Sequence, residues 1–123
     1  MSVFQKVVKE IPDGTILYTP VMRKPFEITK KADLIIFSVG NKTKIPIPKA
    51  IWDGIPKFLS GQDWVDIGSG YNQAKEQSLQ EYIDNHPSRG TQHSSDANYV
   101  ASVLEHLKLA EVIHRRPSRL KLK

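Results

Sequence analysis

The sequence predicts an α+β fold in which a small antiparallel β meander or open barrel precedes a mainly helical segment. Residues 15–48 contain four short runs rich in β-branched and aromatic residues, and turn-forming residues separate these runs. Residues 49–123 instead show apolar side chains at helical spacing. With 123 residues and 39% hydrophobic content, the chain is long enough for one core. We therefore divide it into residues 1–48 and residues 49–123, which are able to pack as one compact unit.

A short amphipathic helix is expected before the first strand. Ser2 is a suitable N-cap, and Pro12-Asp13-Gly14 ends the helical pattern. The apolar residues at helical spacing are Val3, Phe4, Val7, Val8 and Ile11.

Four strands follow in the β-rich segment. Their expected ranges are Thr15–Thr19, Phe26–Lys30, Leu34–Val39 and Lys44–Pro48. Pro46 and Pro48 cannot donate hydrogen bonds to a neighbouring strand, so the fourth strand is expected either at an edge of the sheet or as an extended segment only.

The segment after Pro48 predicts three helices and a short strand. The first helix spans residues 49–59, although Gly54 and Pro56 weaken it and leave a split into two turns as an alternative. A short strand follows at residues 64–67, and Ser78 with Glu81 marks the start of the second helix. The third helix begins near Ser94 or Ser95, and its inner face contains Val100, Val103, Leu104 and Leu107.

A basic β-hairpin is expected at the end of the chain. Glu111–Arg115 and Arg119–Lys123 read as its strands, with Arg116–Ser118 as the turn. In the second strand Leu120 and Leu122 alternate with cations, so one face is apolar and the other is basic.

This order of helix, short strand, helix, helix and hairpin over residues 49–123 resembles a winged helix-turn-helix DNA-binding domain. The residues that carry the resemblance are Ala97–Leu107 and Ala110–Arg116. The resemblance covers about three fifths of the chain. It implies that the third helix approaches a DNA groove and that the hairpin forms the wing.

The net charge of +5 lies entirely in the last nine residues, which hold five basic side chains and no acid. Cations placed against phosphates release condensed counterions, which gives salt-dependent and mostly non-specific affinity. The candidate phosphate contacts are Arg115, Arg116, Arg119, Lys121 and Lys123. On the third helix, Asn98 and Ser102 are candidate groove readers and His106 is a further candidate nucleic-acid contact.

A second basic cluster lies in the β-rich segment, at Arg23, Lys24, Lys30 and Lys31. It is a candidate extension of the DNA-binding face. Lysines on exposed strands also prevent edge-to-edge aggregation, so this alternative stays open.

The sequence predicts no enzyme, cofactor or metal site. There is no cysteine, and none of the four histidines has a spacing suited to zinc. Residues 65–70 look like the first nucleotide-binding loop of an S-adenosylmethionine-dependent methyltransferase, but too few residues follow for a doubly wound sheet. Four aromatic residues at core spacing are expected to be structural rather than base-stacking: Trp52, Phe58, Trp64 and Tyr99.

The leading hypothesis is therefore a small non-catalytic protein that binds double-stranded DNA. The absence of cysteine and of a long apolar run favours a cytoplasmic protein outside the membrane, with no small-molecule substrate evident. The alternative is an adaptor module that binds a protein partner or a second copy of itself. It is motivated by the third helix, which has no Lys or Arg between Asp96 and Leu107.

Overall fold

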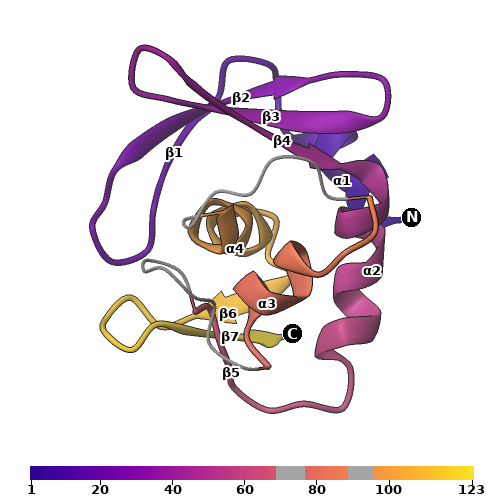
Figure 1. Cartoon of the computed structure of the whole chain (residues 1–123), viewed down its shortest axis with the longest axis vertical. Coiled ribbons are helices and arrows are strands. Elements are labelled where there is room, and N and C mark those ends of the chain that lie inside the picture. The colour runs from indigo at the N-terminus through magenta and orange to yellow at the C-terminus, as the bar shows by residue number, and fades with distance from the viewer. Residues whose placement is uncertain (69–76, 89–95) are drawn as a thin grey trace.

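The computed structural model describes residues 1–68, 77–88 and 96–123 of a mixed α+β protein. The helices are α1 (Val3–Glu10), α2 (Lys49–Leu59), α3 (Leu79–Asp84) and α4 (Asp96–His106). The strands are β1 (Ile16–Tyr18), β2 (Pro25–Lys30), β3 (Leu34–Val39), β4 (Thr43–Pro48), β5 (Val65–Asp66), β6 (Ala110–Val112) and β7 (Arg119–Leu122). A four-stranded antiparallel sheet and a three-stranded sheet lie on opposite sides of α4, and α2 runs along one flank (Figure 1).

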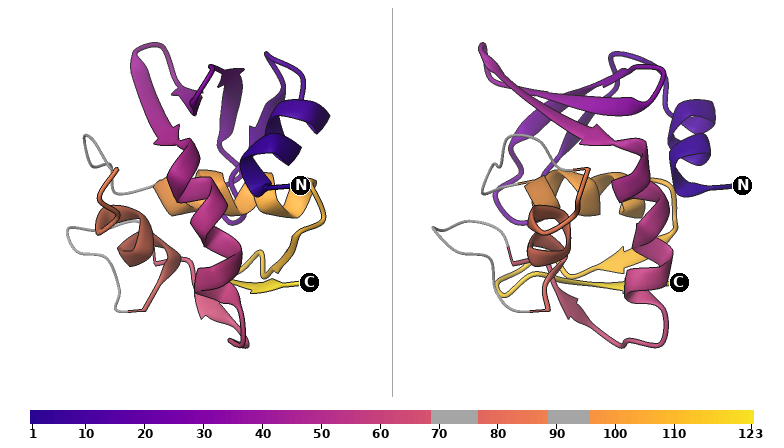
Figure 2. Two further views of the ribbon diagram at one scale, coloured as in Figure 1. Left: turned by 90° about the vertical axis from the view of Figure 1, so that its right-hand side faces the viewer. Right: turned by 45° about the vertical axis from the view of Figure 1, so that its right-hand side comes forward.

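Helix α1 begins at the predicted N-cap. The Ser2 hydroxyl accepts a hydrogen bond from the Gln5 amide at 3.2 Å, and the Gln5 side chain accepts one from the Ser2 amide at 3.1 Å. The helix lies beside α2 (Figure 2), and the amide of Phe4 donates to the Asp53 carboxylate at 3.0 Å. Val8 was expected on the apolar face but is 38% exposed.

The first sheet has the strand order β1-β2-β3-β4, with each pair antiparallel. Strand β4, which contains both prolines, lies at an edge as predicted. Alternate residues of three strands point into the core: Phe26, Ile28, Ile35, Phe37, Ile45 and Ile47.

An aromatic cluster joins this sheet to the helices behind it. The ring of Phe37 lies 5.3 Å from Phe26, 6.0 Å from Trp52 on α2 and 5.8 Å from Tyr99 on α4, measured between centroids. The buried residues of segments 1–48 and 49–123 thus belong to a single core cluster. Helix α4 consequently has the first sheet on one side and the rest of the C-terminal segment on the other (Figure 1).

Helix α2 has the predicted bounds and is continuous, so Gly54 and Pro56 do not split it into two turns. Four of its side chains are buried, and this tertiary packing outweighs weak local propensity. They are Ile51, Trp52, Ile55 and Leu59. Helix α3 has the predicted N-cap, since the Ser78 hydroxyl accepts from the Glu81 amide at 3.1 Å.

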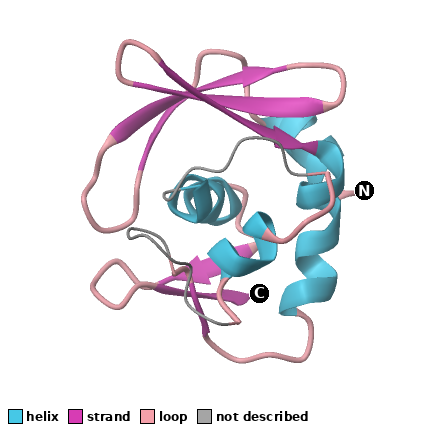
Figure 3. Ribbon diagram, in the orientation of Figure 1, coloured by secondary structure: helices cyan, strands magenta, loops and turns pink. Residues whose placement is uncertain are grey.

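The second sheet has the order β5-β7-β6, so the terminal hairpin gains a third strand from the segment between α2 and α3. Strand β6 ends earlier than predicted, and residues 113–118 form a longer connecting loop (Figure 3). The predicted start of the third helix near Ser94 lies outside the described residues. Within the described part of the chain, no helix combines the length and apolar character needed to cross a membrane.

Candidate nucleic-acid interface

The loop at the tip of the β6–β7 hairpin reaches the first sheet. Arg115 and Arg116 are exposed in this tip loop, residues 113–118. The Arg116 guanidinium donates a hydrogen bond to the Met22 sulfur at 3.4 Å. Met22 belongs to the loop between β1 and β2, residues 19–24, and both loops lie on the same side of the molecule (Figure 3). The tip loop and the β1–β2 loop, which lie near opposite ends of the sequence, are therefore in contact.

Hydrogen bonds within the β1–β2 loop fix the backbone that carries its two cations, Arg23 and Lys24. The Thr19 amide donates to the Lys24 carbonyl at 3.0 Å, and the Thr19 hydroxyl accepts from the Lys24 amide at 3.0 Å. Arg23 has a φ of 55°, in the left-handed region, and its guanidinium lies 5.6 Å from the centroid of the Tyr18 ring.

We call Arg23, Lys24, Arg115 and Arg116 the basic edge. All four side chains belong to exposed residues. No acidic side chain forms an ion pair with them among the residues that the structure describes. Because like charges so arranged raise the local positive potential, the basic edge favours an anionic partner.

The cations of β7 have a different environment. Arg119 Nε lies 3.1 Å from Asp66 Oδ1, and Lys121 Nζ lies 3.3 Å from Asp63 Oδ1. Glu111 is the cross-strand partner of Lys121 on β6. The negative charge of these acids lowers the positive potential that a phosphate group would meet near Arg119 and Lys121. These two cations are therefore weaker candidate phosphate contacts than Arg115 and Arg116.

Lys123 is exposed, but it follows the end of β7 that is remote from the tip loop. Its amide donates to the Leu109 carbonyl at 3.0 Å. The five C-terminal cations therefore divide into two at the tip, two paired along β7 and one at the far end.

The basic cluster predicted in the β-rich segment also splits into two groups in the structure. Lys30 and Lys31 lie at the opposite end of β2 from Arg23 and Lys24. Lys30 Nζ donates to the Val8 carbonyl at 2.9 Å, which holds it against α1. Only Arg23 and Lys24 join the basic edge.

The candidate groove readers do not share an exposed face. Ser102 is 7% exposed, and its hydroxyl donates to the Tyr18 carbonyl of β1 at 2.8 Å. Asn98 is half-buried, whereas His106 is exposed near the C-terminal end of α4. The expectation of a free reading surface at Ser102 was wrong, because the first sheet covers this side of α4.

Two residues of the site, Tyr18 and Met22, were not predicted from the sequence. Tyr18 contacts Ser102 and Arg23, and Met22 contacts Arg116. The contacts with Ser102 and Arg116 join segments that lie far apart in the sequence, so no local pattern indicates them.

Of the aromatic residues predicted to be structural, Trp52 and Tyr99 are buried. Trp64 is 39% exposed, and Lys121 Nζ lies 5.9 Å from its ring centroid. The Trp64 ring therefore lies beside Lys121 of β7, in the second sheet.

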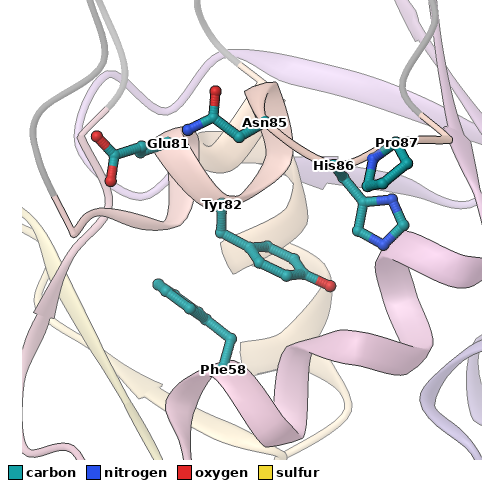
Figure 4. A pocket seen from close by; sticks show the side chains of 6 residues that line it. All are labelled: Phe58, Glu81, Tyr82, Asn85, His86 and Pro87. Atoms are coloured by element: carbon teal, nitrogen blue, oxygen red, sulfur yellow. The ribbon is translucent and has the colours of Figure 1, made fainter.

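An open pocket of about 320 Å³ lies beside α3. Figure 4 shows its wall formed by the stacked rings of Phe58 and Tyr82, whose centroids are 4.8 Å apart. Glu81 and His86 lie at opposite ends of the pocket, so the carboxylate does not orient the imidazole. Glu81 instead accepts from the Gln77 amide at 3.0 Å, and His86 Nδ1 lies 2.8 Å from the Ser88 hydroxyl. These polar groups serve local structure.

The Tyr82 hydroxyl in this pocket donates to the Ile51 carbonyl of α2 at 2.8 Å. Burial, together with the nearby Asp53 carboxylate, raises the pKa of Tyr82 from 10 to about 12. Folding favours the neutral form of Tyr82, because its pKa is higher in the folded protein than in the unfolded chain. The contribution of neutral Tyr82 to the free energy of unfolding is therefore complete below pH 10 and is lost as pH rises toward about 12.

We therefore expect the free energy of unfolding to fall more between about pH 9 and about pH 11 in the wild type than in Tyr82→Phe. Urea unfolding at a series of pH values measures this difference. Burial also raises the pKa of Tyr99, so a smaller loss should persist in the variant. Equal slopes in the two proteins would contradict the assignment to Tyr82.

The structure bears on two other kinds of site that were considered from the sequence, a nucleotide-binding loop and a metal site. Strand β5 pairs antiparallel with β7, unlike the parallel sheet of a methyltransferase, and residues 69–70 of the glycine-containing loop lie outside the described residues. Across residues 1–68, 77–88 and 96–123, no group of three or more His, Asp or Glu side chains is arranged to hold a metal ion.

Comparison of the chain with models of protein families, with curated proteins and with solved structures finds no match.

Proposed function

We propose that this protein binds double-stranded DNA without catalysis, through phosphate contacts from the basic edge. The observation that carries this proposal is the contact between Arg116 and Met22, which brings the loop of Arg115 and Arg116 to the loop of Arg23 and Lys24. All four cations are exposed in loops on the same side of the molecule, and the folded hairpins that present them reduce the entropy lost on binding.

The C-terminal segment supports a winged-helix-like arrangement. Its elements follow the order α2, β5, α3, α4, β6 and β7, and β5 pairs with the hairpin that we propose as the wing. DNA contact is then made by the tip of this hairpin and by the β1–β2 loop, not by α4. Most of α4 is buried, so recognition should depend on the backbone of the DNA more than on its bases.

The test is the salt dependence of DNA affinity for Arg115→Ala combined with Arg116→Ala. Loss of two phosphate contacts should weaken binding about tenfold or more near 100 mM salt, and should lower the slope of log affinity against log salt by about 1.8. Fluorescence anisotropy with a labelled duplex of about 20 base pairs, between about 50 and 200 mM NaCl, measures both quantities.

The matched control is Arg119→Ala combined with Lys121→Ala. It removes the same formal charge from the same hairpin, but these two cations already have acidic neighbours. We expect a clearly smaller change in the slope. If both double variants change affinity and slope alike, the effect is one of net charge and the assignment to the basic edge fails.

A further inference from the structure

The outer face of the four-stranded sheet lies open in every view, with α4 on its inner side only (Figures 1 and 2). No element within the described parts of the chain covers it. Glu27 and Lys44 are exposed on this face, and Leu34, Ile36 and Pro46 are half-buried. It is thus apolar along its centre and charged at two places.

Strand pairing places the two charges symmetrically about β3. Glu27 pairs with Ser38, and Ser38 pairs with Lys44, so the three residues form one row across β2, β3 and β4. The Lys44 ammonium donates to the Ser38 hydroxyl at 2.8 Å, which directs it over the face. In a neighbouring row Ile36 lies on β3 between Thr29 and Pro46.

A two-fold axis parallel to β3, between two facing copies of this sheet, exchanges the side of β2 with the side of β4. Glu27 of each copy then faces Lys44 of the other, while Ile36 packs against its own equivalent. Such a self-complementary patch is what an isologous interface requires. We infer that a second copy of this chain docks on the outer face of the sheet and forms a face-to-face dimer.

The edges of the same sheet are less suited to association. Strand β4 contains Pro46 and Pro48, which lack the amide hydrogen needed to add a strand. Strand β1 has three residues, and its Tyr18 carbonyl already accepts from Ser102. Packing face to face avoids both obstacles.

The size of the face sets the expected strength. Four strands spaced by about 4.8 Å and about 20 Å long project roughly 300–400 Å² per copy. A standard interface buries about 800 Å² per partner, so the dimer should be weak and visible only at high protein concentration.

Sedimentation velocity between about 5 and 500 μM tests this inference. The intact protein should shift from monomer to dimer across this range. Glu27→Lys and Lys44→Glu should each raise the dissociation constant about tenfold or more, because each places like charges opposite one another. The double variant exchanges the two charges and should return the dissociation constant to within about threefold of the wild type.

Lys57→Glu, on the exposed side of α2, is the matched control for a change of charge and should leave association unaltered. A far-UV spectrum and a melting curve confirm that each variant is folded. A protein that stays monomeric throughout, or a double variant that fails to restore the dimer, overturns the inference. The face is distinct from the basic edge, so removing Arg115 and Arg116 should weaken DNA binding without changing dimerisation.

Discussion

Phe37→Ala is expected to lower the free energy of unfolding by about 3–5 kcal/mol. The Phe37 side chain is fully buried, and its ring contacts Phe26, Trp52 and Tyr99. Removing it leaves a cavity and ends two edge-to-face ring contacts, with Phe26 and Trp52, and one tilted contact with Tyr99. Urea unfolding followed by tryptophan fluorescence and by far-UV circular dichroism measures the loss.

The same variant tests whether residues 1–48 and 49–123 unfold together. Both tryptophans, Trp52 and Trp64, belong to residues 49–123, so fluorescence reports on that segment, whereas the dichroism signal includes both segments. With a shared core, both signals should move to lower urea by the same amount. Two separated transitions, with only one displaced, would contradict a single cooperative unit.

Ile16→Ala is the control for deletion of an aliphatic side chain on the same sheet. Ile16 is 53% exposed on β1, so the loss should stay below about 1 kcal/mol. If Ile16→Ala lowers the free energy of unfolding as much as Phe37→Ala does, the effect of Phe37→Ala is not specific to the aromatic cluster.

Local patterns in the sequence predicted much of the fold. The branched and aromatic runs between residues 15 and 48 indicated the four strands, because alternate side chains there face the core. Ser2 and Ser78 indicated the helix starts, since a hydroxyl can satisfy an otherwise free amide. Leu120 is buried, as the alternation in the hairpin predicted.

The environment of α4 was not predicted, although the sequence contains a relevant pattern. This helix has no Lys or Arg, and it carries the small residues Ala97, Ala101 and Ser102 around its surface. Such composition is typical of a helix that is covered on more than one side. The missing cations, which weakened the case for groove reading, are explained by the first sheet packed against α4.

Local sequence patterns also could not predict which of the C-terminal cations are paired with acidic side chains. A count of charge in residues 115–123 gives five equivalent cations. Strand pairing between β5 and β7 brings Asp66 to Arg119, across a separation of 53 residues. Only the tertiary structure distinguishes a paired cation from one at the tip of the hairpin.

Gly54→Ala is expected to destabilise the protein by about 1–3 kcal/mol, although alanine is the better helix former. A β-carbon at Gly54 would overlap the hydroxyl of Tyr82. The ring must then move, which strains the packing and weakens its hydrogen bond to the Ile51 carbonyl. These losses exceed the gain of about 1 kcal/mol from helix propensity. Urea unfolding at neutral pH measures the net change.

Combining Gly54→Ala with Tyr82→Phe tests whether the loss of stability comes from the clash with the Tyr82 hydroxyl or from another effect of alanine at this position. Without the hydroxyl, the nearest ring atom lies 3.4 Å from the new β-carbon, which is an ordinary contact distance. Tyr82→Phe alone should cost about 1 kcal/mol through loss of the hydrogen bond. The double variant should then be no less stable than Tyr82→Phe, so the coupling free energy should be about 1–3 kcal/mol. If the two losses simply add, the helix rejects alanine for another reason and the close approach of α3 to α2 does not explain Gly54.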